Sequence, residues 1–255
     1  MKIRQHIPNA ITCCNLAAGF YACILALNGH CAAALLAVLL AAALDVADGL
    51  AARLLDARSA IGKDLDSLAD AVSFGVAPGM ALFDLIDRMQ HAVAWTPAWA
   101  GKAFLAAAFA VPVLSALRLA RFNHDARQET SFIGLPVPAH AVFWMALVSA
   151  VSPAAGGTGF GAGLSFHLFA VCDAGAALPA VIVATAALAV ATSLLLVAPV
   201  AMFSLKMTSL RWRGNGRRYV LLAVAAVLVA CLGALGIALT VVCYVLLSIF
   251  NRRNE

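Results

Sequence analysis

Long apolar segments, each about as long as a bilayer is thick, constrain the fold of this chain more than any other feature. A transmembrane helix needs about 20 predominantly apolar residues. Hydrophobic residues make up 64% of the sequence and charged residues 11%, which excludes a water-soluble globular domain. The sequence therefore predicts an all-α, polytopic membrane helix bundle. The expected spans are residues 9–28, 31–53, 65–87, 102–121, 137–153 and 176–203.

The last apolar segment, residues 219–250, is too long for one straight crossing. As a single helix it would extend about 48 Å, against a hydrocarbon core of about 30 Å. Arginines flank it on both sides, and Gly233 and Gly236 near its middle permit a bend or a tight hairpin. We therefore expect two short spans here and eight in total, with seven spans or one long tilted helix as the alternative. Because no segment is polar enough for a soluble domain, residues 1–255 are expected to form one membrane-embedded domain with a C-terminal helical extension at 219–250.

Basic residues are distributed unevenly across this topology. If both termini are cytoplasmic, fifteen of the seventeen Lys and Arg fall on the inner side, and only Arg88 and Lys102 on the outer side. This is the positive-inside pattern, and it predicts a multi-pass protein of the bacterial inner membrane. The basic residues lie at helix ends, which suits membrane lipid or phosphate groups and argues against nucleic acid as a partner.

Acidic residues cluster in one short region of this apolar chain. Six of the ten aspartates lie between Asp45 and Asp70. Asp45 and Asp48 are spaced i, i+3, and Asp66 and Asp70 are spaced i, i+4, so each pair shares a helix face. The two pairs would face each other across a cytoplasmic turn. A carboxylate inside a membrane costs about 2.5–3.5 kcal/mol, and hard divalent cations are the natural compensating ligands. The spacing therefore predicts a site for divalent metal ions.

Three small residues, Gly49, Ala52 and Gly62, lie on or near the same face. Small residues in membrane helices usually permit close helix packing. Beside four carboxylates they equally suit room for a flat ligand and its phosphates. The sequence leaves both interpretations open.

The region 45–70 has the pattern D-x2-D-G-x2-A-R-x8-G-x3-D-x3-D, and it resembles the signature of the CDP-alcohol phosphotransferase family at all eight fixed positions. The resemblance implies a six-helix membrane core whose members displace CMP from a CDP-linked lipid or alcohol. It also implies two bound metal ions, Mg²⁺ or Mn²⁺, and Asp70 as the general base. The implied metal ligands are Asp45, Asp48, Asp66 and Asp70, and the implied CDP contacts are Asp48, Gly49, Ala52, Arg53 and Gly62.

Three further stretches, IPNAITCCNLAAGF, SFGVAPG and RLARFN followed by FIGLPVPA, resemble the phosphatidylserine synthase branch of that family. The substrates implied are CDP-diacylglycerol and L-serine, the products phosphatidylserine and CMP, and a homodimer is compatible with the resemblance. Asn9 and Thr12 either cap the first helix or, as the resemblance implies, lie near the nucleotide.

A serine acceptor carries a carboxylate, so its site needs a cation. Arg118 and Arg121 are spaced i, i+3 at the expected inner end of the fourth span, and Asn123 follows them. They are either positive-inside anchors or a site for the serine carboxylate or a lipid phosphate.

Two alternative functions remain at this stage. Another member of the same family would use glycerol phosphate, inositol phosphate or choline as the acceptor. An ion-coupled transporter also places aspartates in membranes, but it is expected to show interrupted helices in two corresponding halves, and the sequence has no such halves.

Overall fold

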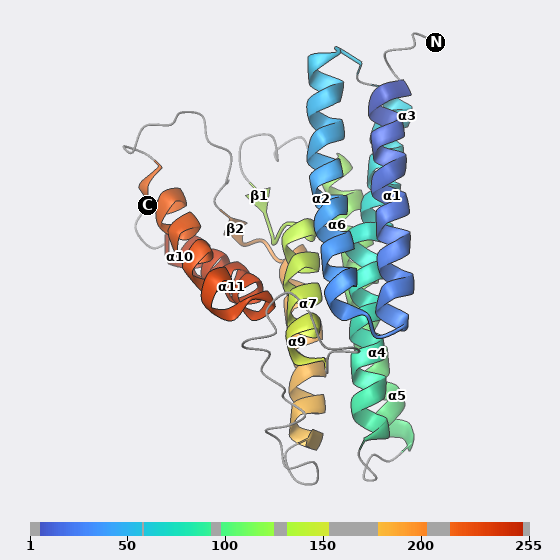
Figure 1. Ribbon diagram of the computed structural model, residues 1–255, viewed down its shortest axis with the longest axis vertical. Coiled ribbons are helices and arrows are strands. Elements are labelled where there is room, and N and C mark those ends of the chain that lie inside the picture. The colour runs from blue at the N-terminus through green and yellow to red at the C-terminus, as the bar shows by residue number, and fades with distance from the viewer. Residues whose placement is uncertain are drawn as a thin grey trace.

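The computed structural model describes residues 6–57, 59–92, 98–124, 132–152, 178–202 and 215–251. Within these residues the protein is a bundle of long helices (Figure 1), so the predicted all-α membrane bundle is confirmed. The elements are α1 (His6–Leu27), α2 (Cys31–Leu54), α3 (Ala60–Asp70), the π-helix η2 (Ala71–Val76), α4 (Ala77–His91), α5 (Ala98–Ala108), α6 (Ala110–His124), β1 (Phe132–Ile133), α7 (Val137–Val151), α9 (Leu178–Val197), β2 (Ala201–Met202), α10 (Gly216–Leu232) and α11 (Ala234–Asn251).

Five helical stretches among the described residues are long and apolar enough to cross a membrane. Each predicted span contains helix, but α7, α10 and α11 are shorter than the other five. This pattern identifies an integral membrane protein. The five long stretches are His6–Leu27, Cys31–Leu54, Ala60–His91, Trp99–Asn123 and Leu178–Val197.

The stretch from α3 through η2 to α4 is the centre of the bundle. Two thirds of an apolar 18-residue segment of this stretch is buried, against one third or less of the corresponding segment in each of the other four long stretches. Gly75 and Gly79 let this stretch approach α6 closely: a Cβ added at Gly79 would lie 2.8 Å from Cδ of Pro112. Part of the SFGVAPG stretch therefore serves helix packing.

The C-terminal apolar segment folds as a helix hairpin. α10 ends at Leu232, Gly233 adopts a φ of 56°, and α11 begins at Ala234. Positive φ is readily available to glycine. The two-helix form of this segment is thus confirmed, and its two outer ends lie on the same side of the hairpin (Figure 1).

One short strand pairing was not predicted. Phe132 pairs with Met202 and Ile133 with Ala201 in an antiparallel ladder. The N–H of Gly134 also donates to the carbonyl of Val200 at 2.7 Å. This pairing ties the entrance of α7 to the segment that follows α9. Two-residue strands carry almost no periodic signal, so this pairing could not be predicted from the pattern of residues.

Candidate active site

A tight turn between α2 and α3 brings the ends of the two acidic helices together. Asp56 adopts a φ of 46°, and the N–H of Ala57 donates to the carbonyl of Ala52, which closes the end of α2 in the manner of a Schellman motif. Ser59 then caps α3 by accepting a hydrogen bond from the N–H of Gly62 at 3.0 Å. The turn sends α3 back antiparallel to α2, and α1 packs against both helices.

Three of the four aspartates meet across this helix pair. Ligand oxygens of Asp45, Asp48 and Asp66 all lie within 4.8 Å of one another. Asp48 is buried, whereas Asp45 and Asp66 are half-buried. Asp70 lies one helical turn beyond Asp66, is buried, and contacts α1 instead of joining this group of three. The two aspartate pairs were predicted to face each other, and three of the four carboxylates do so, whereas Asp70 lies outside the group.

The donor set of this cluster fits a hard divalent cation. None of the four aspartates forms a salt bridge with another described residue. Oδ1 of Asp66 is buried and has no hydrogen-bond partner within the described part of the chain. Carboxylates crowded in this way repel one another unless a cation neutralises them. The Asp45, Asp48 and Asp66 cluster is therefore able to hold a divalent metal.

Helix α1 donates hydrogen bonds to this acidic region from two positions. Oγ1 of Thr12 donates to Oδ2 of Asp48 at 2.6 Å. One turn further along α1, Nδ2 of Asn15 donates to Oδ1 of Asp70 at 3.4 Å. Asn15 is not among the residues predicted for the site. It lies three residues after Thr12, so the two share a face of α1, and this spacing was the one available signal.

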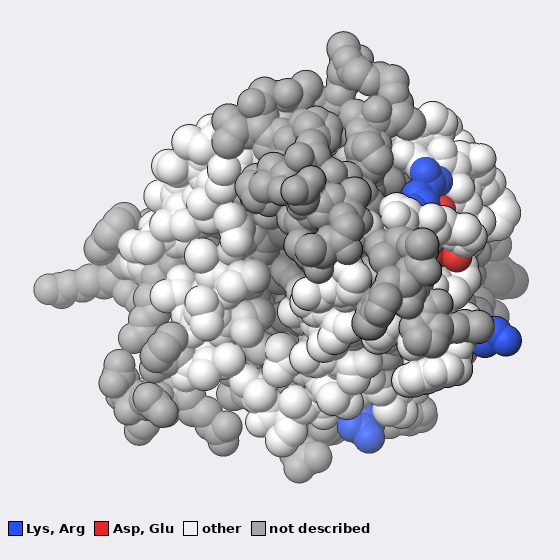
Figure 2. All heavy atoms as spheres, turned by 90° about the horizontal axis from the view of Figure 1, so that it is seen from below, with Lys and Arg blue, Asp and Glu red and all other residues white. Residues whose placement is uncertain are grey.

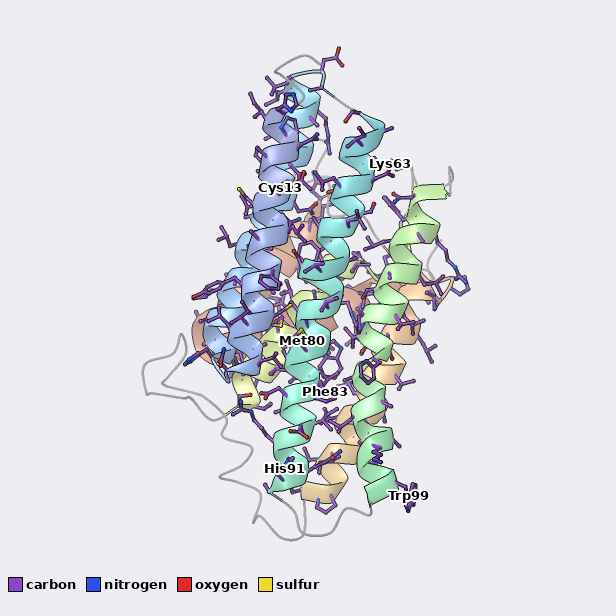
Figure 3. The ribbon with its side chains drawn as sticks, turned by 90° about the vertical axis from the view of Figure 1, so that its right-hand side faces the viewer. Cys13, Lys63, Met80, Phe83, His91 and Trp99 are labelled. Carbon is purple, nitrogen blue, oxygen red and sulfur yellow. The ribbon has the colours of Figure 1, made fainter. Side chains whose placement is uncertain are left out.

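A cleft of about 490 Å³ opens beside the cluster. Six of the seven predicted CDP contacts line it, Arg53 being the exception. Arg53 is exposed and close by, since a Cβ added at Gly49 would lie 4.0 Å from its Nη2. Lys63 also lines the cleft, although it was not among the residues predicted for the site. It lies at the same end of the bundle as Cys13, the neighbour of Thr12 (Figure 3). The lining residues are Pro8, Asn9, Thr12, Asp48, Gly49, Ala52, Ala57, Ser59, Ala60, Gly62, Lys63 and Asp66.

The three residues predicted for the acceptor do not line this cleft, and they have different environments. Arg118 is buried, and its Nε has no hydrogen-bond partner among the described residues; its guanidinium lies 5.3 Å from the ring centre of Phe122. Arg121 is exposed.

Asn123, the third of these residues, connects α6 to α3. Its Nδ2 donates to Oγ of Ser67 at 2.7 Å, and its backbone carbonyl accepts from Nζ of Lys63 at 2.9 Å. Its side-chain amide thus already has a protein partner in this structure.

Known proteins resemble part of this chain. Over 152 residues, which are 57% of this chain and 49% of the relative, it is 37% identical to the CDP-diacylglycerol–serine O-phosphatidyltransferase of Mycobacterium tuberculosis. The protein of the same name from Bacillus subtilis is 34% identical over 134 residues, 52% of this chain and 70% of the relative. An archaetidylserine synthase of Methanothermobacter thermautotrophicus is 31% identical over 140 residues, 53% of this chain and 54% of the relative.

The chain thus spans about half the length of the mycobacterial relatives that it matches. The profile of one family, described as CDP-alcohol phosphatidyltransferase, matches residues 5–249. This match covers nearly the whole chain and agrees with the motif at residues 45–70. The protein belongs to the CDP-alcohol phosphatidyltransferase family.

Proposed function

We propose that this protein transfers the phosphatidyl group of CDP-diacylglycerol to the hydroxyl of L-serine, giving phosphatidylserine and CMP. The observation that carries the proposal is the meeting of Asp45, Asp48 and Asp66 within 4.8 Å beside a cleft of about 490 Å³. Family membership and relatives named as serine O-phosphatidyltransferases support the choice of reaction and acceptor.

The cleft suits the CDP part of the donor. A Cβ added at Gly49 would meet no described atom closer than Nη2 of Arg53, at 4.0 Å, so a flat base or a phosphate has room beside α2. Lys63 and Arg53 place positive charge at and near the cleft, where they would attract a diphosphate. The acyl chains would remain in the bilayer while the nucleotide occupies the cleft.

The acidic cluster would hold the metal ions that this family generally requires. Asp45, Asp48, Asp66 and Asp70 are the proposed ligands, and two Mg²⁺ or Mn²⁺ ions would match their charge. Bound ions would supply electrostatic stabilisation of the charge that grows on the departing CMP.

Asp70 is the proposed general base. Its carboxylate would accept the proton of the serine hydroxyl as that oxygen attacks the lipid-side phosphorus. The new bond joins the serine oxygen to phosphorus, and the bond that breaks joins phosphorus to the CMP oxygen. Burial of Asp70 keeps bulk water away from the transferred proton.

Arg118 is the better candidate of the two arginines for the acceptor carboxylate. Asn123 contacts Ser67, and Ser115 lies against Gly75, so α6 runs antiparallel to the α3–η2 stretch. Arg118 lies between these two contacts, which puts it within about one helical turn of the level of Asp70. A buried guanidinium whose Nε has no hydrogen-bond partner within the described residues favours an anionic ligand.

The paired substitutions Arg118→Lys and Arg121→Lys test this part of the proposal. Lysine keeps the charge but loses the planar fork that binds a carboxylate through two bonds. We expect Arg118→Lys to raise the KM for serine about tenfold with little change for CDP-diacylglycerol, and Arg121→Lys to change neither. Equal effects of the two substitutions on the serine KM would contradict the assignment.

The active site is proposed to face the cytoplasm of a bacterial inner membrane. Lys63 lies at the cleft end of the bundle, and His91 and Trp99 lie at the opposite end (Figure 3). Seen from that opposite end, the described surface carries few charged side chains (Figure 2). This distribution follows the positive-inside rule if the cleft end is cytoplasmic. A homodimer remains a prediction from the family resemblance.

CMP release by the purified protein in detergent tests the proposed reaction. CDP-diacylglycerol is offered with serine, glycerol phosphate, inositol phosphate or choline, each with and without EDTA. We expect CMP and phosphatidylserine only with serine, loss of activity with EDTA, and recovery on adding Mg²⁺ or Mn²⁺. Turnover with another acceptor would reassign the substrate. Absence of CMP release with any acceptor, together with solute flux in vesicles, would favour a transporter.

A further inference from the structure

Asn15 is a polar side chain at the centre of the bundle that the proposed reaction does not yet use. It lies in the middle of α1, and none of its surface is exposed. A primary amide has two donor hydrogens and one acceptor oxygen, and burying it without partners is costly. Its contacts therefore show what it does in the fold.

Both ends of the Asn15 amide have partners on the α3–η2 stretch. Nδ2 donates to Oδ1 of Asp70 at 3.4 Å, and Oδ1 accepts from Oγ of Ser73 at 2.8 Å. The Ser73 hydroxyl also lies 3.1 Å from the backbone carbonyl of Asn15. A hydroxyl that donates to Oδ1 fixes the orientation of the amide, with the nitrogen toward the carboxylate.

The backbone holds Ser73 in this place. Ser73 lies within the π-helix that begins directly after Asp70, and single π-helical turns often occur at functional sites. Gly19 of α1 faces it so closely that an added Cβ would lie 2.6 Å from the Cα of Ser73. Close contact of the two backbones leaves the serine hydroxyl little freedom to leave Asn15.

The remaining oxygen of Asp70 is left available. Within the part of the chain that the structure describes, no hydrogen bond to Oδ2 of Asp70 is present, and Oδ1 is held by Asn15 alone. A hydrogen bond to one oxygen restricts the rotation of a carboxylate and so limits the directions in which the other oxygen points. Hydrogen bonds of this kind orient the groups that carry out the chemistry.

We propose that Asn15, oriented by Ser73, is a positioning residue that anchors Oδ1 of Asp70 and directs Oδ2 toward the acceptor hydroxyl. The inference rests on the proposed function, because it assigns Asp70 the role of base. It also distinguishes the two contacts of α1: Thr12 holds a carboxylate of the group of three, whereas Asn15 holds the carboxylate that takes the proton.

Two substitutions, one at Asn15 and one at Ser73, test the proposal. Asn15→Asp has the same shape and keeps an acceptor for Ser73, but it presents an oxygen to Asp70 in place of the N–H. We expect kcat to fall about 10- to 100-fold, with KM for CDP-diacylglycerol within about twofold, because the cleft residues are untouched. Ser73→Ala frees the amide and is expected to lower kcat several-fold with the same unchanged KM.

The matched control is Ser248→Ala on α11. Ser248 is also buried, and its hydroxyl donates to the carbonyl of Tyr244 in its own helix at 2.8 Å. We expect its kcat and KM to equal those of the unchanged protein. Full kcat in Asn15→Asp or in Ser73→Ala would overturn the proposal, as would a control that loses as much activity. If Asn15→Asp does not fold, the kcat of Ser73→Ala alone tests the proposal.

A second measurement does not depend on catalysis. Thermal unfolding of Asn15→Ala, Asp70→Asn and the double variant forms a double-mutant cycle. We expect the two changes to be non-additive because the side chains are in contact, and additive shifts would overturn the anchoring of Asp70. If the unchanged protein releases no CMP with any acceptor, the proposed function fails while this cycle still tests the contact.

Discussion

Two helix hairpins of this protein use glycine in opposite ways. In the α2–α3 hairpin, the one described atom that a Cβ added at Gly49 would meet is Nη2 of Arg53, at 4.0 Å. In the α10–α11 hairpin, a Cβ added at Gly236 would lie 2.0 Å from the backbone carbonyl oxygen of Leu228. The first glycine leaves space, and the second allows two helices to touch.

The difference shows that a small residue in a membrane helix has two distinct uses. The C-terminal hairpin carries no acidic residue between 216 and 251 and packs through its backbone. The α2–α3 hairpin carries six aspartates and keeps a cleft lined by two of them, Asp48 and Asp66. Close packing follows the small-residue rule for membrane helices, whereas open space beside charge indicates a ligand.

The largest expected effect comes from replacing aspartates of the α2–α3 hairpin, since the α10–α11 hairpin has none. Asp66→Asn and Asp70→Asn should each lower CMP release on the order of 10³-fold or more, because a proposed metal ligand or the proposed base is lost. Both variants should elute from size exclusion as the unchanged protein does. Thr240→Val, which removes a hydroxyl bonded to the carbonyl of Gly236 in α11, is the control and should keep full activity. Near-normal turnover in either aspartate variant would remove the active-site assignment.

A second effect concerns the closely packed hairpin. Gly236→Ala forces Leu228 and its backbone to shift, which we expect to cost about 1–3 kcal/mol of unfolding free energy. Thermal unfolding in detergent should show a lower midpoint, while the KM for CDP-diacylglycerol stays the same in the folded fraction. An unchanged midpoint would show that the hairpin is free to open without cost.

The smallest effect concerns the open hairpin. Gly49→Ala should leave the unfolding midpoint unchanged or slightly higher, since alanine favours helix by up to about 1 kcal/mol over glycine. Its methyl group occupies part of the cleft, so the KM for CDP-diacylglycerol should rise several-fold. A lower midpoint with an unaltered KM would place Gly49 with the packing glycines and break the comparison.

Much of the fold could be predicted because its signals are local. Apolar length located the helices, and the glycines near residue 233 indicated the C-terminal hairpin. The spacing of Asp45, Asp48 and Asp66 set which helix face each occupies, so their approach followed once α2 and α3 were antiparallel.

Other features depend on contacts between distant residues. Asn15 reaches Asp70 across 55 positions, and Asn123 reaches Ser67 across 56. Arg118 and Arg121 look alike in the sequence, yet one is buried and the other exposed. These outcomes depend on how α1 and α6 lie against the central α3–η2–α4 stretch, which no local pattern specifies.

By itself, the sequence determined that the chain crosses a membrane repeatedly and that acidic side chains share helix faces, because hydrophobic length and helical period act within single segments. Only the tertiary structure decided that Gly49 lines a cleft and that Gly236 packs against the neighbouring helix. It also decided which aspartates receive hydrogen bonds from α1, namely Asp48 and Asp70. Both depend on the distance and register between helices, which side-chain packing fixes after the segments have formed.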